Sequence, residues 1–328
     1  MKEFAGRLAV ITGAGSGMGR ELAVQLAAEG AHLGLCDVSV ENLEETRELC
    51  LAAGPGVTVS VHRCDVSDEA QMEAFRDGVL AEHDTDHVHL LFNNAGIGGG
   101  GSLLNDPRED WERTFGVCWY GVYYGARVFL PLLVAADEGH IVNTSSVNGF
   151  WASIGADIPH TAYSAAKFAV KGFSEALIAD LRVNAPHVKV SVVMPGHIGT
   201  SIVANSMKVL RGHDSSQMTA EEVAAARDRM KARGMPVDNV PDEHIRAAMA
   251  QQAADFRDKA PLSAAAAAAI ILDGVRDGRW RILVGKDAEQ LDAAVRAAPE
   301  EAYEPDFVQR IQDPGFLAGA LDGEPVSG

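Results

Sequence analysis

The sequence predicts an α/β fold, a single domain built on a doubly wound parallel sheet of seven strands. Short apolar runs alternate along the chain with longer segments of helical periodicity, which is the order of elements in a parallel sheet. The runs are almost continuously apolar, as strands are when helices cover both faces of the sheet. Because crossovers between parallel strands are right-handed, a doubly wound sheet is the expected topology. The expected strands are residues 8–13, 31–37, 57–66, 88–96, 140–146, 189–196 and 279–285.

The helical segments follow from the spacing of their apolar residues. In residues 18–30, apolar residues recur along one helical face, and residues 162–183 repeat this periodicity over a longer stretch. Residues 263–272 are the most apolar segment. We expect them to form a buried helix that begins at Ser263 as its N-terminal cap.

Two parts of the chain fall outside this alternation. Residues 201–262 are rich in methionine, alanine and charged residues, and we expect two or three amphipathic helices there. They would form a lid on the substrate side, within a single domain of residues 1–296. Residues 297–328 are acidic and contain prolines, so a partly ordered C-terminal extension is expected.

Composition excludes several kinds of partner. Lys and Arg total 28 against 46 Asp and Glu, and the net charge of −18 argues against a nucleic-acid partner. The four cysteines form no C-x-x-C pair and follow no ligand spacing, so we expect reduced thiols and a cytoplasmic location. His87 and His89 are the closest pair of histidines, and such a pair is more often structural than metal-binding, so no metal is expected. No apolar stretch approaches the ~18–20 residues that cross a bilayer, so no membrane contact is expected. The N-terminal apolar run is too short for a secretion signal.

Four glycines lie between the first expected strand and the first expected helix, in the stretch Thr12–Gly19 (TGAGSGMG). Glycine in regular structure costs about 0.5–1 kcal/mol relative to alanine, so such a cluster needs a reason. A glycine loop between a strand and a helix is typical of a site where backbone approaches a phosphate. The general dinucleotide pattern G-x-G-x-x-G does not fit, because Met18 or Arg20 occupies the last glycine position.

The spacing T-G-x-x-x-G-x-G resembles the cofactor loop of the short-chain dehydrogenase/reductase family, which implies a Rossmann fold and a nicotinamide cofactor. Gly13 is then expected to make the turn off the strand, Gly17 to let backbone approach the pyrophosphate, and Gly19 to let the helix pack closely. Asp37 follows Gly13 by 24 residues, where a carboxylate accepts both hydroxyls of the adenosine ribose and repels a 2′-phosphate. NAD is therefore expected in preference to NADP; a solvated aspartate at a strand end is the alternative. The resemblance also implies that Asp65 and Val66 contact the adenine. The other cofactor contacts that it implies come from Thr12, Ser16, Met18, Asn93, Ala95, Gly96, Tyr163, Lys167, Pro195, Gly196, Ile198 and Thr200.

The resemblance extends to Tyr163 and Lys167, a Y-x-x-x-K pair whose spacing of four places both side chains on one helix face. An ammonium beside a phenol, together with the positive nicotinamide ring of the implied cofactor, favours the phenolate and lowers the tyrosine pKa. Tyr163 is thus expected to act as general base in alcohol oxidation or general acid in ketone reduction. Ser146 matches the family serine that hydrogen-bonds the substrate oxygen, and its neighbour Ser145 is the alternative.

Two features depart from the family pattern. Cys118 occupies the position of the usual catalytic asparagine, and a thiol is a weak hydrogen-bond partner. It would still serve if only the backbone carbonyl of that position acts; a buried, inert thiol is expected. Ser146 and Tyr163 are 17 positions apart, more than in similar sequences, so the intervening loop is expected to border a roomy apolar pocket. The expected pocket residues are Asn148, Phe150, Trp151, His160 and His197, with ordinary loop packing of Trp151 as the alternative.

These features predict an NAD-dependent oxidoreductase that interconverts a secondary alcohol and a ketone on a bulky hydrophobic substrate. A 3-oxoacyl thioester reductase is the nearest alternative, disfavoured by Asp37 and the acidic net charge. An NAD-binding protein without turnover is the other, supported only by Cys118. The resemblance also implies a homodimer or homotetramer that pairs the helices before and after the fifth strand.

Overall fold

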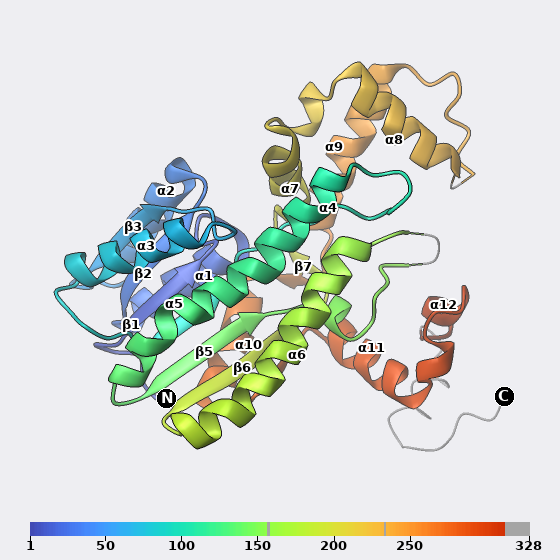
Figure 1. Ribbon diagram of the computed structural model, residues 1–328. Coiled ribbons are helices and arrows are strands. Elements are labelled where there is room, and N and C mark those ends of the chain that lie inside the picture. The colour runs from blue at the N-terminus through green and yellow to red at the C-terminus, as the bar shows by residue number, and fades with distance from the viewer. Residues whose placement is uncertain (156–157, 233, 312–328) are drawn as a thin grey trace.

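A parallel sheet of seven strands forms the centre of the protein, in the order β3-β2-β1-β4-β5-β6-β9 (Figure 1). The computed structural model describes residues 1–155, 158–232 and 234–311. All six strand pairs of this sheet are parallel, and its core strands are buried, which confirms the predicted doubly wound sheet. The strands are β1 (Leu8–Thr12), β2 (His32–Asp37), β3 (Val59–Arg63), β4 (Leu90–Asn93), β5 (Gly139–Thr144), β6 (Val188–Pro195) and β9 (Arg281–Val284), and a separate pair joins β7 (Ile198–Gly199) to β8 (Leu262–Ser263).

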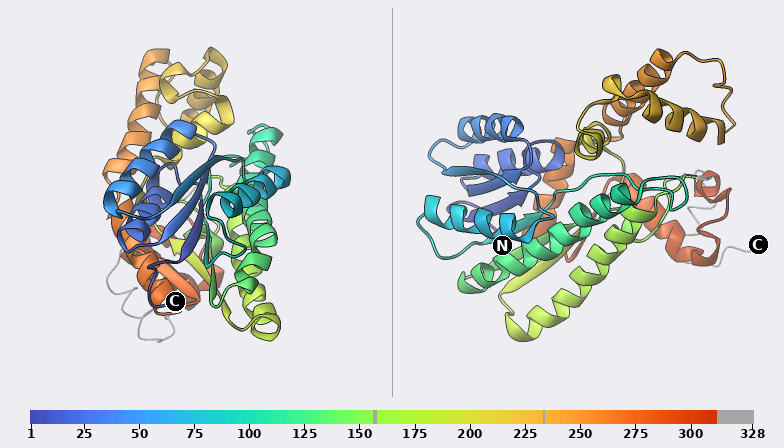
Figure 2. Two further views of the ribbon diagram at one scale, coloured as in Figure 1. Left: turned by 90° about the vertical axis from the view of Figure 1, so that its left-hand side faces the viewer. Right: turned by 45° about the horizontal axis from the view of Figure 1, so that its top comes forward.

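Helices cover both faces of the sheet, and each face has its own hydrophobic core. Helices α1, α2 and α10 cover one face, and α3, α5 and α6 cover the other (Figure 2). The buried side chains of each set form one core with the sheet. The helix predicted after Ser263 is α10, and the Ser263 hydroxyl accepts the backbone N–H of Ala266 at 3.2 Å, as its capping role requires. The helices are α1 (Gly17–Ala28), α2 (Val40–Ala53), α3 (Glu69–Glu82), α4 (Arg108–Phe115), α5 (Gly121–Ala135), α6 (Thr161–Asn184), α7 (Ile202–Arg211), α8 (Ala220–Ala232), α9 (Asp242–Asp258), α10 (Ala264–Arg276), α11 (Lys286–Ala297) and α12 (Phe307–Ile311).

The insertion, residues 201–262, contains the three helices α7, α8 and α9, within the predicted range of two or three. These helices project from one end of the sheet (Figures 1 and 2). They enclose a small core of their own around Met218, Val223 and Ile245, to which further methionines contribute. The pair β7 and β8 joins the two ends of the insertion to the rest of the fold.

The predicted C-terminal extension is ordered over its first part. A short 3-10 helix (Pro299–Glu301) and α12 follow α11, and Phe307 is buried against Trp151. The extension therefore packs onto the loop after β5. Residues 312–328 of the predicted extension lie outside the described residues.

One long apolar helix, over Arg108–Ala135, was not expected from the sequence. It consists of α4, a π-helical turn (Gly116–Tyr120) and α5. It is long and apolar enough to cross a membrane by length and composition alone. Half of its most apolar window is buried inside the protein, and α5 packs on the sheet through Val128 and Phe129. Core helices of soluble proteins pass the same test, so this helix is weak evidence for a membrane.

Two buried histidines, His140 in β5 and His89 just before β4, make the fold sensitive to acid. Burial lowers the pKa of His140 to about 3 and that of His89 to about 4. Because the unfolded histidine titrates near ~6.5, the unfolded chain binds more protons than the folded one between that pH and the folded pKa. Stability is therefore lost as the pH falls below ~6.5, by about 2 kcal/mol for His140 between pH 7 and pH 5.

A His140→Gln variant tests this expectation. Glutamine keeps a polar group near the position of Nε2, which lies 2.8 Å from the Ser191 hydroxyl. Urea unfolding at pH 7 and pH 5 should show a smaller loss of unfolding free energy in the variant. An equal loss in both proteins would show that His140 does not drive the acid sensitivity.

Candidate active site

The candidate site lies at the carboxyl edge of the sheet, where ligands bind in open α/β folds. A cleft of about 300 Å³ opens there between the loop after β1, the ends of β2, β3 and β4, and helix α7. Ten residues predicted at the cofactor line it: Gly13, Ser16, Gly17, Met18, Asp37, Asp65, Val66, Ala95, Gly96 and Thr200. The other eight, Thr12, Gly19, Asn93, Tyr163, Lys167, Pro195, Gly196 and Ile198, do not line it.

The glycine loop has the geometry that a dinucleotide requires. Gly13 and Gly17 have φ of +65° and +54°, which favours glycine at both positions. A Cβ on Gly19 would overlap the carbonyl oxygen of Gly13 and lie 2.6 Å from Nδ2 of Asn94. Gly19 thus lets α1 begin directly against the loop, so that its N-terminus faces the cleft.

Asp37 is held in a fixed orientation at the end of β2. Its two carboxylate oxygens accept the backbone N–H groups of Gly15 and Ser39, both at 3.0 Å. Arg20 packs between α1 and α2. It donates to the Gly15 carbonyl at 2.7 Å and pairs with Glu45 at 2.6 Å. Its charge is therefore committed to bracing the glycine loop.

Asp65 forms an ion pair across the cleft mouth that the sequence did not reveal. Its carboxylate lies 2.7 Å from Arg113 of α4 and accepts the Ser67 hydroxyl at 2.7 Å. Burial raises the pKa of Asp65, but Arg113 and Ser67 outweigh it and lower the pKa overall. Asp65 is thus a fixed anion beside the predicted adenine position.

Thr12 and Asn93 brace the strand ends. The Thr12 hydroxyl accepts the backbone N–H groups of Asn94 and Ala95 at 3.0 and 3.1 Å, which joins β1 to β4. Asn93 is buried and donates to Asn143 of β5 at 2.8 Å. These contacts keep β1, β4 and β5 in register beneath the cleft.

Ser146, Tyr163 and Lys167 come together where β5 ends and α6 begins. A hydrogen bond joins Ser146 and Tyr163, and the Lys167 ammonium lies 5.4 Å from the Tyr163 ring centre. Lys167 Nζ donates to the Thr144 carbonyl at 2.8 Å. A Cβ on Gly96 would lie 3.6 Å from the same Nζ, so the cluster borders the cleft at Gly96.

The structure separates the two adjacent serines. Ser145 is buried and donates its hydroxyl proton to the backbone carbonyl of Lys167 at 2.8 Å. Ser146 Oγ accepts the backbone N–H of Asn148 at 3.1 Å and hydrogen-bonds Tyr163, so its hydroxyl lies beside the phenol. This geometry favours Ser146 as the substrate-binding serine.

The expected lowering of the tyrosine pKa is not found in this structure. Burial raises the pKa of Tyr163 well above its usual value, and proximity to Cys118 adds to this, while the Ser146 hydrogen bond opposes it. Burial also lowers the pKa of Lys167. Desolvation is the largest contribution to both pKa values, and for Tyr163 it favours the phenol over the phenolate.

Cys118 lies in the π-helical turn, beside Tyr163 and Lys167. It is fully buried, and its thiol donates to the Ile97 carbonyl at 3.1 Å. The side chain thus anchors the loop after β4. All four cysteines are free thiols.

The five predicted pocket residues divide into two groups. The His160 ring lies 4.8 Å from that of Tyr163, and burial lowers its pKa to about 4, so a neutral imidazole borders the phenol. The other four residues make their contacts away from the Tyr163 phenol. Asn148 donates to the Trp151 and Ser153 carbonyls at 3.0 and 2.6 Å, which fixes the loop.

Two aromatic side chains and one imidazole pack away from the Tyr163 phenol. Trp151 is buried, and its indole N–H donates to the Ala302 carbonyl at 2.6 Å, so the alternative of loop packing describes its observed contacts. Phe150 packs in the same cluster. His197 Nε2 lies 2.7 Å from the Phe256 carbonyl and thus holds α9 against the sheet.

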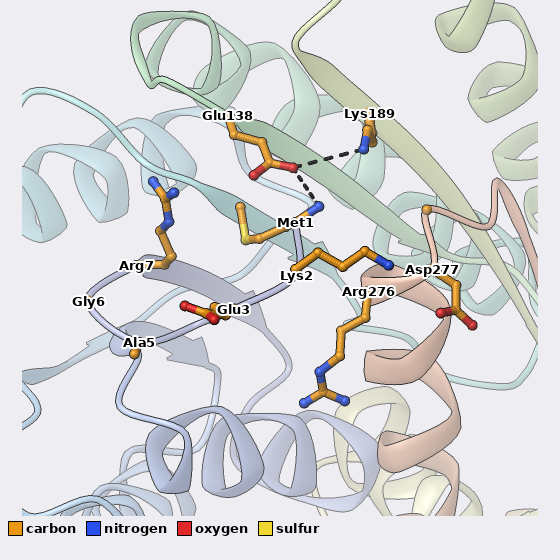
Figure 3. Close-up of a pocket in the computed structure, with 11 residues that line it drawn as sticks. Met1, Lys2, Glu3, Ala5, Gly6, Arg7, Glu138, Lys189, Arg276 and Asp277 are labelled. Atoms are coloured by element: carbon orange, nitrogen blue, oxygen red, sulfur yellow. Dashed lines mark ion pairs between the residues drawn. The ribbon is translucent and has the colours of Figure 1, made fainter.

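A second cavity, of about 590 Å³, lies at the opposite, amino edge of the sheet (Figure 3). Glu138 there pairs with the Met1 amine at 2.5 Å and lies 3.9 Å from Lys189 (Figure 3). Its lining comes from the residues before β1, the start of β5 and the end of α10. The catalytic cluster and the glycine loop do not line it. Among the described residues, no group of three or more His, Cys, Asp or Glu gathers as a metal site requires.

Comparison with known proteins agrees with this geometry. Residues 7–211 match the short chain dehydrogenase family. SadH of Mycobacterium tuberculosis H37Rv, described as an oxidoreductase, is 37% identical over 298 residues, which cover 90% of this chain and 92% of SadH. Levodione reductase of Leifsonia aquatica is 35% identical over 224 residues, covering 67% of this chain and 79% of that protein.

Solved structures show the same relationship. A short chain dehydrogenase/reductase of Burkholderia phymatum in complex with NAD matches with a TM-score of 0.72 and 34% identity, covering 92% of this chain and 95% of that one. A metagenomic short-chain oxidoreductase in complex with NADP matches with a TM-score of 0.52 and 34% identity, covering 59% and 83%. The fold, the cleft at the glycine loop and these matches lead to one conclusion: the chain belongs to the short-chain dehydrogenase/reductase family and is an oxidoreductase that acts on CH–OH groups.

Proposed function

We propose that this protein is an NAD-dependent dehydrogenase that interconverts a secondary alcohol and a ketone, with Tyr163 as the general acid or base. The observation that carries the proposal is the cluster of Ser146, Tyr163 and Lys167 at the border of the cleft. The cleft fits a dinucleotide, since Gly13 and Gly17 line it without side chains and the N-terminus of α1 faces it. A bound nicotinamide would supply or accept the hydride.

The side chains of this protein would manage the proton and the substrate oxygen. Ser146, whose oxygen accepts the Asn148 N–H and which hydrogen-bonds Tyr163 in this structure, would turn its hydroxyl proton to that oxygen. Tyr163 gives its proton to the carbonyl oxygen during reduction and takes it back during oxidation. Lys167, held by the Thr144 carbonyl, places a positive charge below the phenol and would hold the ribose hydroxyls.

The substrate proposed is bulky and hydrophobic. The loop after β5 and the insertion both border the site, and neutral His160 lies beside the phenol rather than a charged group. A cyclic ketone or alcohol would suit these apolar and neutral surroundings. The relative levodione reductase is named for the reduction of a dione, which supports a ketone substrate. Phe150 and Trp151 support the loop from behind.

The test is a panel of secondary alcohols and matching ketones, graded by size, followed through the absorbance of the reduced nicotinamide. We expect turnover that rises with apolar bulk and is lost with 3-oxoacyl thioesters. Tight NAD binding with no turnover on any of these compounds would favour the alternative of a binding protein. A preference for thioesters would favour the reductase alternative.

Preference for NAD over NADP is proposed to rest on Asp37. An Asp37→Asn variant keeps the side-chain shape and one acceptor oxygen but loses the charge that opposes a 2′-phosphate. We expect the Kd of NADP to improve about tenfold and that of NAD to worsen several-fold. Glu41→Gln removes the same charge from the same cleft and should change the NADP to NAD ratio little. Equal ratios in all three proteins would contradict the role of Asp37.

A homodimer or homotetramer in the cytoplasm is proposed as the working form. The exposed aromatic side chains of Tyr120, Tyr123 and Phe168, near or on the neighbouring helices α5 and α6, support pairing through that face. Light scattering of the purified protein would measure the assembly.

A further inference from the structure

Helix α7 of the insertion lies directly across the glycine loop. Asn205 Nδ2 donates to the Ser16 hydroxyl at 3.0 Å, at the start of α1. One residue further, the Ser206 hydroxyl accepts the backbone N–H of Gly98 at 2.8 Å, beyond the end of β4. The insertion therefore touches both walls of the cleft through one helix.

The charges that line the cleft are unbalanced. Three carboxylates line it, those of Asp37, Glu41 and Asp65. Arg113 also lines it, but this cation is paired with Asp65 at 2.7 Å. Lys208 of α7 is the remaining cation. It forms no ion pair with a described carboxylate, although its charge helps to lower the pKa of Asp214, which lies outside the cleft lining. The chain has a net charge of −18, so an exposed lysine without an ion pair in the cleft lining is unusual. Such a cation would attract an anionic ligand into the cleft.

The spacing of α7 aims Lys208 at the same region as Asn205. Residues three apart lie on one helix face and about 4.5 Å apart along its axis. Asn205 already meets Ser16, where the positive end of α1 attracts phosphate. The flexible stem of Lys208 spans the remaining distance with three donors at its tip.

We propose that Lys208 and Asn205 bind the pyrophosphate of the dinucleotide, so that the insertion closes on the cofactor as well as on the substrate. This inference rests on the proposed function, because it requires a dinucleotide in the cleft. Lys208 supplies the positive charge, and Asn205 supplies an amide that exchanges the Ser16 hydroxyl for a phosphate oxygen. The insertion is then ordered by the cofactor before the substrate arrives.

Binding measurements on Lys208→Ala test the inference apart from catalysis. Calorimetry with ADP-ribose, which carries the pyrophosphate, and with adenosine, which lacks it, separates phosphate contacts from contacts to the base and ribose. We expect the Kd of ADP-ribose to rise roughly tenfold and that of adenosine to stay unchanged. Lys208→Arg should restore most of the affinity. The dependence of ADP-ribose binding on salt should also be weaker in Lys208→Ala.

Lys231→Ala is the matched control, because it removes the same charge from α8 of the same insertion outside the cleft, where Lys231 pairs with Asp238 at 2.5 Å. This variant should bind ADP-ribose as the parent does. An equal loss in both lysine variants would show a general charge effect and overturn the inference.

Two further outcomes overturn it. An unchanged Kd of ADP-ribose in Lys208→Ala would show that Lys208 does not contact the pyrophosphate. A loss confined to NADP, with NAD and ADP-ribose unaffected, would assign Lys208 to a 2′-phosphate instead. If the parent protein binds neither dinucleotide nor ADP-ribose, the proposed function fails together with the inference, and the parent titration alone reports that.

Discussion

Replacing Tyr163 by phenylalanine is expected to lower kcat about a thousandfold while leaving the Kd of NADH within about twofold. The variant loses only the hydroxyl that donates the proton to the substrate oxygen. The ring, its contact with His160 and its place above Lys167 all remain. Steady-state kinetics on the best ketone of the panel, with NADH binding measured by fluorescence, would give both numbers.

The pH profile should carry the signature of the same group. Burial raises the pKa of Tyr163, so the phenol stays protonated at neutral pH and serves ketone reduction directly. Oxidation of the alcohol requires the deprotonated phenol. The rate of oxidation should therefore rise with pH above neutrality, as the phenol, whose ordinary pKa is ~10, begins to lose its proton. The Tyr163→Phe variant should lose this rise.

Tyr123→Phe is a matched control, because it removes a hydroxyl from an exposed tyrosine on α5. This control should retain full activity. A Tyr163→Phe enzyme with more than a tenth of the parental kcat would show that another group, such as Ser146, delivers the proton.

Strands and the glycine loop were predictable because their causes are local. A buried parallel strand must be apolar along its whole length, so β1, β5 and β6 stand out in the sequence. The glycines at Gly13 and Gly17 are required by a positive φ. The strand ends shifted by one to three residues, because polar residues such as Asn94 leave the ladder to brace the loop.

Other parts of the site depend on contacts between residues far apart in the chain. His197 reads as a pocket residue in the sequence, yet the Phe256 carbonyl, 59 residues later, occupies its imidazole. Trp151 is held by Ala302, 151 residues away. Nothing local in a sequence distinguishes an aromatic side chain that lines a pocket from one that packs against a distant helix.

The contacts of the insertion were also beyond prediction. Asn205 and Lys208 belong to an ordinary amphipathic pattern, and only the fold brings them to Ser16 and the cleft. The same holds for Arg113, whose charge meets Asp65 across more than forty residues of chain. The sequence predicted helices in the insertion because periodicity is local, but the face that each helix turns to the cleft is set by tertiary packing.

Replacing Gly19 by alanine should be the most damaging small change in the cofactor loop. The added Cβ would overlap the Gly13 carbonyl oxygen and approach Asn94 Nδ2, and Asn94 in turn donates to the carbonyls of Thr12 and Gly13 at 3.1 and 3.3 Å. Because backbone lies on one side and a bonded amide on the other, the first turn of α1 must move away from the loop. We expect a loss of about 3 kcal/mol in unfolding free energy and a rise of more than tenfold in the Kd of NADH.

Gly172→Ala provides the matched control for Gly19→Ala. Gly172 lies in the middle of α6, and a Cβ there would meet no atom within 4 Å. Alanine at an open helical position should stabilise the fold by up to about 1 kcal/mol, since it restricts the unfolded chain and has a higher helix propensity. Urea unfolding and NADH fluorescence titration of both variants measure the contrast. If Gly19→Ala unfolds and binds like the parent, α1 has room to shift at its first turn, and close packing at Gly19 does not determine cofactor binding. If only binding is lost, the strain is confined to the loop. The N-terminus of α1 has then moved away from the pyrophosphate position without destabilising the sheet.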